Sequence, residues 1–264
     1  MHDHSGSRVL VTGACGGIGE AIARRFAAAG AAVALADIRG PELATLAAEL
    51  SASGATVHHQ VVDVGEEAAV QAFCASAASE LGSVNQLVNT VGSVDNMGDV
   101  AELPLAVWER TLRVNLTSAY LMAHHATPFM IAAGGGSIVN ISSISGLANQ
   151  ARMMAYSVTK AAMLALTRSE AIDLARHGIR ANAVCPGSVE TSLVDEAIQL
   201  MAAETDRSPE ETRRDWESEY PTGRFTQPNE IADLVLFLCS PQASNITGAS
   251  FVIDGGLTSL LAER

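Results

Sequence analysis

The stretch Val9-Leu-Val-Thr-Gly-Ala-Cys-Gly-Gly-Ile-Gly19 decides the fold of this chain, because an apolar run gives way there to glycines and then to an alanine-rich segment. Residues 9–11 predict a buried parallel strand. Ile18, Ile22 and Phe26 follow with the i, i+4, i+8 spacing of a helix that packs on such a strand. The glycines therefore lie in a turn between a strand and a helix.

This turn has the properties of a phosphate-binding loop. The free N–H groups of a first helical turn and the positive end of the helix dipole attract a pyrophosphate, provided that no side chain keeps it away. Gly13, Gly17 and Gly19 leave that space. We interpret the stretch as a dinucleotide-binding loop, and the alternative is a turn that uses glycine only for its positive φ.

Length and composition favour one α/β domain. The chain has 264 residues, of which 48% are hydrophobic, so it can bury a full core. We expect a disordered tail over residues 1–7 and a single catalytic domain over residues 8–264. No apolar run is long enough to span a membrane, and residues 1–7 lack the features of a signal peptide, so we expect a cytoplasmic protein.

The charge and the metal-binding residue types exclude other classes of function. A net charge of -13 argues against a nucleic-acid partner, which usually needs a basic face. The four cysteines are far apart and form no CxxC pair, so reduced thiols are expected. His58 and His59 are adjacent, as are His124 and His125, and neither pair has the spacing of paired metal ligands. We predict no metal site.

An acidic residue indicates which dinucleotide binds. A second apolar run, residues 32–36, ends at Asp37, which lies at a suitable distance after Gly19 to accept hydrogen bonds from an adenosine ribose. Its carboxylate would repel the 2′-phosphate of NADP, so we predict NAD. The alternative is an aspartate that caps the next helix, and Arg39 is the only nearby residue that could receive a phosphate.

The remaining pattern alternates between strands and helices. Strands are predicted at 56–62, 86–89, 137–141, 179–184 and 248–253, and helices at 41–53, 66–81, 104–132, 161–176 and 227–239. Such alternation predicts a Rossmann-type doubly wound sheet of seven parallel strands with helices on both faces. The acidic stretch 190–222 is expected to form a helical substrate lid, and the alternative is a solvated pair of surface helices.

A tyrosine and a lysine form a candidate acid–base pair. Tyr156 and Lys160 are one helical turn apart, and Ser143 follows the fifth strand at the same carboxyl edge of the sheet as the glycine turn. An ammonium beside a phenol favours the phenolate. Lys160 is also the only lysine in the chain, against fifteen arginines, which suggests a position that needs a compact cation. We expect its amine to be exposed in the empty cofactor cleft and to become buried when the cofactor binds.

With these residues in order, residues 8–257 resemble the short-chain dehydrogenases/reductases. The resemblance rests on the following motifs: Thr12-Gly-x-x-x-Gly17-Ile-Gly19, Asp63, Asn89 with Gly92, Asn115, Ser143, Tyr156-x-x-x-Lys160, Pro186-Gly187 and Thr191. It implies an NAD-dependent oxidoreductase that moves a hydride between nicotinamide and a secondary alcohol or ketone. One departure is Asn89-Thr90-Val91-Gly92, where the family usually has Asn-Asn-Ala-Gly, and the bulkier Val91 is expected to alter affinity on the adenosine side.

The resemblance also implies roles for individual residues. Tyr156 would be the acid–base residue, Ser143 would hold the substrate oxygen, Lys160 would bind the nicotinamide ribose, and Asn115 would order a water in a proton relay. The cofactor is expected to contact Gly13, Cys15, Gly17, Ile18, Gly19, Asp37, Ile38, Asp63, Val64, Asn89, Val91, Gly92, Tyr156, Lys160, Pro186, Gly187, Val189 and Thr191.

The substrate itself is less well determined by the sequence. The expected pocket wall suits a moderately bulky apolar group and comprises Val94, Met97, Ser145, Leu147, Gln150, Met153, Met154, Val189 and Leu193. Arg152 is the nearest cation, and we interpret it as solvated.

The resemblance further implies a homo-oligomer, a tetramer or a dimer, with the long helices around Asn115 and Lys160 in the main dimer contact. Two alternative functions are a non-catalytic dinucleotide-binding regulator or scaffold and a sugar-nucleotide epimerase. The intact catalytic residues argue against the first, and the short chain after the sixth strand argues against the second.

Overall fold

A single sheet of seven parallel strands forms the centre of the computed structural model, which describes residues 3–94 and 98–260. The strands are β1 (Arg8–Thr12), β2 (Ala32–Asp37), β3 (Val57–Val61), β4 (Gln86–Asn89), β5 (Gly136–Ile141), β6 (Ile179–Pro186) and β7 (Ser250–Ile253). Their order is β3-β2-β1-β4-β5-β6-β7. The predicted fold class is confirmed.

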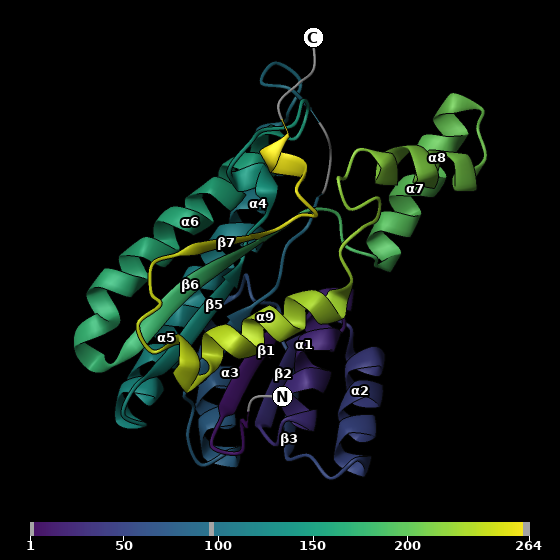
Figure 1. Ribbon diagram of the computed structural model, residues 1–264. Helices are drawn as coiled ribbons and strands as arrows, with labels where there is room; N and C mark the ends of the chain where they lie inside the picture. Colours follow the sequence, from purple (N-terminus) through teal and green to yellow (C-terminus); the bar gives the residue numbers. More distant parts are fainter. Residues whose placement is uncertain (1–2, 95–97, 261–264) are drawn as a thin grey trace.

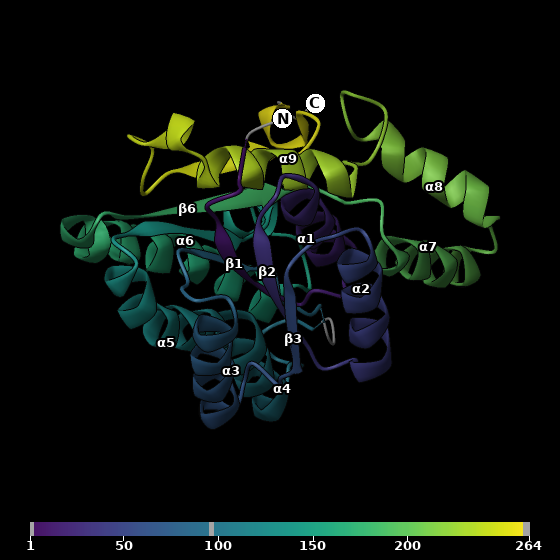
Figure 2. The same cartoon turned by 90° about the horizontal axis from the view of Figure 1, so that it is seen from below.

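Helices cover both faces of the sheet (Figure 2). One face carries α1 (Gly17–Ala28), α2 (Gly40–Ala52) and α9 (Pro228–Cys239), and the other carries α3 (Glu67–Glu80), α4 (Leu105–Leu112), α5 (Ser118–Ala132) and α6 (Met154–Leu174). The side chains of β1 show why both faces are apolar. Val9 and Val11 belong to the core under α1, whereas Leu10 belongs to the core under α3 and α5.

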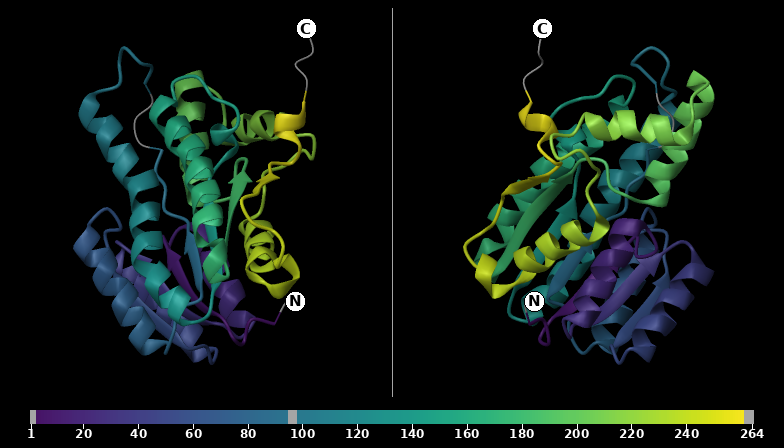
Figure 3. Two further views of the ribbon diagram at one scale, coloured as in Figure 1. Left: turned by 90° about the vertical axis from the view of Figure 1, so that its left-hand side faces the viewer. Right: turned by 45° about the vertical axis from the view of Figure 1, so that its right-hand side comes forward.

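The strand order determines where ligands can bind. The chain runs outward from β1 in one direction and, after β3, returns to β4 on the other side of β1. A crevice forms at such a reversal, outside the carboxyl ends of the strands. The helices α7 (Ser192–Thr205) and α8 (Pro209–Ser218) extend beyond this same edge (Figures 1 and 3).

The predicted long helix over residues 104–132 is interrupted. A π-helical segment, Arg113–Thr117, separates α4 from α5. Asn115 lies within it, fully buried, and its amide group bonds with the backbone of Ser93. A π segment adds one residue to the helical turn, which is how a helix presents one side chain at an unusual angle. Residues 105–132 are thus helical throughout, but the expectation of one regular α-helix is wrong around Asn115.

The expectation of a disordered tail is also wrong for residues 3–7. The backbone N–H of His4 donates to Ala29 O at 3.0 Å, and its ring packs edge-on against Phe26 at the end of α1. Ser7 is buried as well. These contacts extend the core beneath the amino end of β1.

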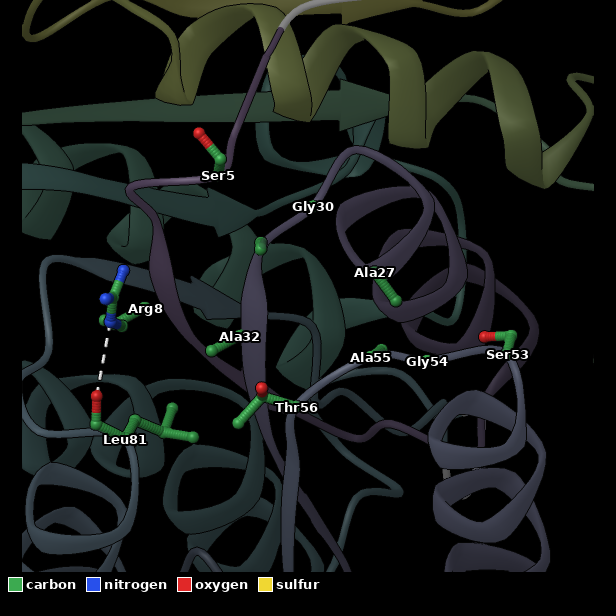
Figure 4. Close-up of a pocket in the computed structure, with 11 residues that line it drawn as sticks. Ser5, Arg8, Ala27, Gly30, Ala32, Ser53, Gly54, Ala55, Thr56 and Leu81 are labelled. Carbon is green, nitrogen blue, oxygen red and sulfur yellow. Dashed lines mark hydrogen bonds between the residues drawn. The ribbon is translucent and has the colours of Figure 1, made fainter.

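An open hollow of about 390 Å³ lies at the amino edge of the sheet, opposite the crevice (Figure 4). Arg8 borders it and donates from Nε to Leu81 O at 3.2 Å, which satisfies a carbonyl at the end of α3. The predicted site residues follow the carboxyl ends of the strands, so this hollow is separate from the candidate active site.

A buried polar chain joins α6 to the sheet. Asn89 Nδ2 donates to Asn140 Oδ1 at 2.8 Å, and Asn140 Nδ2 donates to Glu170 Oε2 at 2.8 Å. Glu170 is only 7% exposed, and its Oε1 has no hydrogen-bond partner among the described residues. Burial raises the pKa of Glu170 from 4.5 to about 7, although the hydrogen bond from Asn140 opposes this shift.

The raised pKa predicts a pH-dependent stability. Folded protein keeps Glu170 protonated up to about pH 7, whereas the unfolded chain releases this proton near pH 4.5. The contribution of Glu170 to the free energy of unfolding is therefore complete below pH 4.5 and is lost as the pH rises to about 7. Glu170→Gln removes the titration. From pH 5 to pH 8, the free energy of unfolding of wild type should therefore fall by roughly 1 to 3 kcal/mol relative to that of Glu170→Gln.

Urea unfolding of both proteins at the two pH values measures this difference. Asp173→Asn, at an exposed position of the same helix, is the matched control and should show no such pH dependence. An equal stability difference at pH 5 and pH 8 for Glu170→Gln would contradict the prediction.

Candidate active site

Four polar side chains converge at the carboxyl edge of the sheet, as the sequence predicted. Asn115 comes from the π segment, Ser143 follows β5, and Tyr156 and Lys160 lie in the first turns of α6. Asn115, Ser143 and Lys160 are buried, and Tyr156 is partly buried. Three elements that are far apart in the sequence thus form one cluster.

Lys160 is held inside the protein by the backbone. Its Nζ donates to Ile141 O at 3.0 Å and lies 5.6 Å from the centroid of the Tyr156 ring. Burial lowers the pKa of Lys160 from 10.5 to about 8. A Cβ on Gly92 would lie only 3.0 Å from Nζ, so a side chain there would crowd the ammonium.

This packing corrects one expectation about Lys160. The sequence predicts an amine that is exposed in the cofactor cleft, yet Lys160 is only 3% exposed. The backbone around Ile141 and Gly92 covers it. Protection from amine reagents would therefore not by itself report cofactor binding.

Tyr156 and Ser143 form the second half of the cluster. Burial raises the pKa of Tyr156, and a hydrogen bond with Ser143 lowers it in part. The Ser143 hydroxyl also accepts a hydrogen bond from the backbone N–H of Ser145 at 3.1 Å. A phenol and a hydroxyl that lie side by side can together bind one substrate oxygen and exchange a proton with it.

Asn115 connects this cluster to the loop after β4. Its Oδ1 accepts from Ser93 N at 2.8 Å, and its Nδ2 donates to Ser93 O at 2.9 Å. Nδ2 also lies 3.3 Å from Thr159 Oγ1 on α6. Asn115 therefore holds the loop that contains Gly92 against the helix that carries Lys160.

The turn after β1 has no space for side chains at its glycines. A Cβ on Gly19 would lie 2.1 Å from Gly13 O, and Gly13 itself has a φ of +62°. A Cβ on Gly17 would lie 2.5 Å from Thr191 Cγ2. The turn is a narrow cradle of backbone at the amino end of α1, and the segment after β6 lies against it.

Asp37 is more strongly bound to the protein than the sequence suggested. Its Oδ2 accepts from Cys15 N at 2.9 Å, and Arg39 donates to both oxygens at 3.2 and 3.3 Å. Burial opposes ionisation, but hydrogen bonds from Arg39 and from Cys15 N–H outweigh it and lower the pKa of Asp37. The carboxylate thus stays ionised beside the glycine turn, and Arg39 is paired with it.

The other residues expected to contact the cofactor are distributed around this edge. Asp63 caps its own turn by accepting from Gly65 N at 2.8 Å, and Val64 is buried behind it. Ile38 is largely exposed. Val91 packs against the core, and its Cγ2 would lie 3.2 Å from a Cβ on Gly13. The other five residues lie at this edge of the sheet or directly beneath it: Ile18, Asn89, Pro186, Gly187 and Val189.

The sequence missed the role of Thr90 in this region. Its Oγ1 donates to Thr12 O at 2.5 Å, and its N–H donates to Thr12 Oγ1 at 3.2 Å. The departure from the usual family motif therefore ties the loop after β4 to the glycine turn, through the threonine rather than through Val91.

The expected substrate residues form only part of a wall. Ser145 is buried and lies 3.4 Å from the Gln150 amide oxygen. Gly98 pairs with Met153, and its N–H donates to Arg152 O at 2.7 Å, so the two loops close one side of the region. Three of the expected wall residues are exposed, namely Val94, Leu147 and Leu193. Met154 is partly buried and Val189 is buried, whereas Met97 lies outside the described residues.

Arg152 is not available to a substrate anion in this arrangement. Its guanidinium pairs with Glu102 at 2.9 Å, and its backbone is in the left-handed region with a φ of 63°. The interpretation of Arg152 as a surface cation agrees with this ion pair.

No metal cluster and no membrane-spanning helix occur in the part of the chain that the structure describes. No group of three or more His, Cys, Asp or Glu side chains is arranged to hold an ion there. The helices are too short or too polar to cross a bilayer.

Comparisons with known proteins agree with this geometry. A family model described as enoyl-(acyl carrier protein) reductase matches residues 13–258. The chain is 39% identical to 2-(S)-hydroxypropyl-CoM dehydrogenase 3 of Xanthobacter autotrophicus, over 96% of each chain. It is 38% identical to cis-4-hydroxycyclohexanecarboxylate dehydrogenase of Sinomonas cyclohexanicum, over 95% of this chain and 96% of the relative.

Two solved structures are similar throughout. Ligand-free aldohexose dehydrogenase of Thermoplasma acidophilum has a TM-score of 0.86 and 35% identity, covering 97% of this chain and 95% of that one. Levodione reductase has a TM-score of 0.90 and 28% identity, covering 97% and 99%.

Proposed function

The chain belongs to the short-chain dehydrogenase/reductase family, and on this basis we propose that it is an NAD-dependent alcohol dehydrogenase or carbonyl reductase with Tyr156 as its acid–base residue. It is an oxidoreductase that transfers hydride between a nicotinamide cofactor and a secondary alcohol or ketone, and the alternative of a non-catalytic regulator is set aside. The observation that carries the assignment of Tyr156 is its position beside both Ser143 and the Lys160 ammonium.

The residues present fit a dinucleotide. The turn has no space for a Cβ at Gly13, Gly17 or Gly19, and it presents backbone N–H groups at the start of α1, as a pyrophosphate requires. Nicotinamide supplies or accepts the hydride when the cofactor is bound. In the proposed mechanism the chain itself does the rest, which is to orient the substrate oxygen and to move one proton.

Ser143 and Tyr156 bind the substrate oxygen in this mechanism. During oxidation, ionised Tyr156 takes the hydroxyl proton, and during reduction the protonated phenol returns it. Lys160 lowers the pKa of Tyr156 when its ammonium is charged, and it contacts the nicotinamide ribose. Asn115 keeps the Ser93 loop in place and orders a water through which the proton passes to solvent.

Tyr156→Phe tests the acid–base role. The ring and its packing remain, so NADH should bind within about twofold of wild type, whereas kcat should fall at least about a hundredfold because general acid–base catalysis contributes that much or more. NADH fluorescence titration and steady-state kinetics on secondary alcohols measure the two quantities. Tyr120→Phe, at an exposed position of α5, is the control and should keep full activity.

The pH profile of Tyr156 provides a second readout in the same experiment. Oxidation requires the ionised phenol, whose pKa burial has raised, so kcat should rise with pH through the alkaline range. A flat profile, or turnover by Tyr156→Phe, would assign the proton transfer to another group.

Cofactor preference is proposed from Asp37. Its ionised carboxylate lies beside the glycine turn and would repel a 2′-phosphate, while Arg39 is neutralised by the pair and so offers no free cation. Gly16 also leaves the turn without a basic side chain. We therefore propose NAD over NADP.

Asp37→Ser should narrow the preference for NAD by about tenfold or more, because the substitution removes the repulsion and releases Arg39. The double variant Asp37→Ser/Arg39→Ser is the matched control and should lose the part of the gain for NADP that comes from the free guanidinium. The measurement is kcat/KM for each cofactor. Equal values for NAD and NADP with wild type would refute the proposed preference.

A homo-oligomer, a dimer or a tetramer, is proposed from the exposed apolar side chains of α5 and α6. Tyr120 lies on α5, and Val158 and Ile172 lie on α6, where Ile172 is 77% exposed. Apolar side chains that gather on neighbouring helices are typical of a subunit contact.

Ile172→Asp combined with Val158→Asp should lower the mass in solution towards that of the monomer, because each change buries a charge in the contact. Light scattering after size exclusion measures the mass. Leu200→Asp, at an exposed apolar position of α7, is the control and should leave the mass unchanged. A monomeric wild type would contradict the proposal.

Three further proposals follow from the same residues. The cysteines at positions 15, 74, 185 and 239 are all unpaired, which supports a cytoplasmic enzyme. Met153 and Met154 suit a moderately bulky apolar substrate. The α7–α8 pair extends over the carboxyl edge of the sheet and would act as a lid over the substrate (Figure 1).

A further inference from the structure

Residues 186–191 connect the end of β6 to the start of α7, and they lie on one side of the proposed cofactor cleft. Thr191 packs so closely on Gly17 that a Cβ there would lie 2.5 Å from the threonine methyl. The glycine turn forms the other side. Thr191 and Gly17 are therefore in direct contact, and a shift of this segment would change the shape of the proposed cleft beside them.

The segment is held from its outer side by the residues of α8 and the loop after it. The Tyr220 hydroxyl accepts from Ser188 N at 2.9 Å and donates to Ser188 Oγ at 2.6 Å. Glu190 N donates to Thr226 O at 2.9 Å. The strongest contact is ionic, since both carboxylate oxygens of Glu190 lie 2.8 Å from Arg213 Nη1.

Arg213 joins three carboxylates that come from three different elements. Besides Glu190 of the segment, its guanidinium pairs with Asp195 in the first turn of α7 and lies 3.6 Å from Glu217 on α8. It also lies over the Phe225 ring, 5.7 Å from the centroid. The guanidinium is about 28% exposed, so water screens these contacts only in part. The alternative of a solvated pair of surface helices therefore does not describe Arg213.

We propose that Arg213 is a positioning residue for the cofactor, because it holds Glu190 and thereby keeps Thr191 at the correct distance from the glycine turn. The inference rests on the proposed function, since it assumes that a nicotinamide dinucleotide binds along the glycine turn, beside the contact between Gly17 and Thr191.

The effect of removing Arg213 should be confined to cofactor binding. Without the guanidinium, Glu190, Asp195 and Glu217 would be three like charges close together, and their repulsion would move the segment away from the turn. The catalytic cluster would remain in place. Within residues 3–94 and 98–260, the hydrogen bonds of Asn115, Ser143 and Lys160 all go to groups outside residues 186–191.

The test compares Arg213→Met with Arg213→Lys and with a control on the same pair of helices. Arg213→Met keeps an apolar side chain over Phe225 but removes the charge, and it should raise the Kd for NADH and the KM for NAD about tenfold, as expected for the loss of a charge-assisted contact. Its kcat at saturating NAD should stay within about twofold of wild type. Arg213→Lys retains the charge and should recover part of the affinity.

Arg207→Met is the matched control, because Arg207 forms an exposed ion pair with Asp215 at the outer end of the lid. It should bind NADH as wild type does. Glu190→Gln provides a milder variant in case Arg213→Met does not fold, and it should raise the Kd in the same direction by a smaller factor. An unchanged Kd in both Arg213→Met and Glu190→Gln, or a loss of kcat with an unchanged Kd, overturns the proposal.

These outcomes are distinct from failure of the proposed function. A wild type that binds neither NADH nor NADPH refutes the proposed function itself. A wild type that prefers NADPH refutes only the assigned cofactor, and the ratio of Kd values for NADPH between Arg213→Met and wild type then tests the role of Arg213.

Discussion

The close approach of Gly19 to Gly13 is the constraint on which the site depends. The carbonyl oxygen of Gly13 occupies the space of a side chain at Gly19, so α1 can begin directly over the end of β1 only because glycine is there. Phe26 and Ile22 of the same helix are then placed in the core beneath it. The geometry of the turn, the direction of the helix dipole and the packing of the central strand are thus set by a single contact.

Polar groups that are buried at the carboxyl edge form the candidate active site, and each is compensated by the backbone. Lys160 would be costly to bury without Ile141 O, and Asn115 would be costly without the two backbone groups of Ser93. These bonds use the backbone of the loop that follows β4 and of the last residue of β5. Because the sheet fixes both, the side chains are oriented before any ligand arrives.

The α7–α8 pair has its own small apolar cluster, which includes Ile198, Tyr220 and Phe225. It reaches the rest of the molecule mainly through the segment after β6, by way of Ser188 and Glu190. A helical unit that is packed internally but attached by a few polar contacts can change position without disturbing the sheet. Under the proposed function, the same attachment would make cofactor binding sensitive to residues that are remote from the reacting atoms.

The sequence alone determined the sheet, its order of elements and the places of the candidate site residues along them, because these depend on local patterns. Apolar runs that alternate with helical spacing specify a parallel sheet, and the glycines, Ser143, Tyr156 and Lys160 all follow the ends of predicted strands or begin a helix. The roles of the individual cofactor contacts stay a prediction. Asn140 and Glu170 gave a weaker signal, as polar residues within an apolar strand and helix.

Tertiary structure alone decided the partners of charged and polar side chains. The sequence does not reveal that Arg213 meets Glu190 or that Arg39 covers Asp37, because the energy of an ion pair depends on distance and burial rather than on spacing along the chain. The same reason explains Lys160, which is closed in by Gly92 from the loop after β4. Local patterns specify which elements form, and only their packing determines which charges share a site.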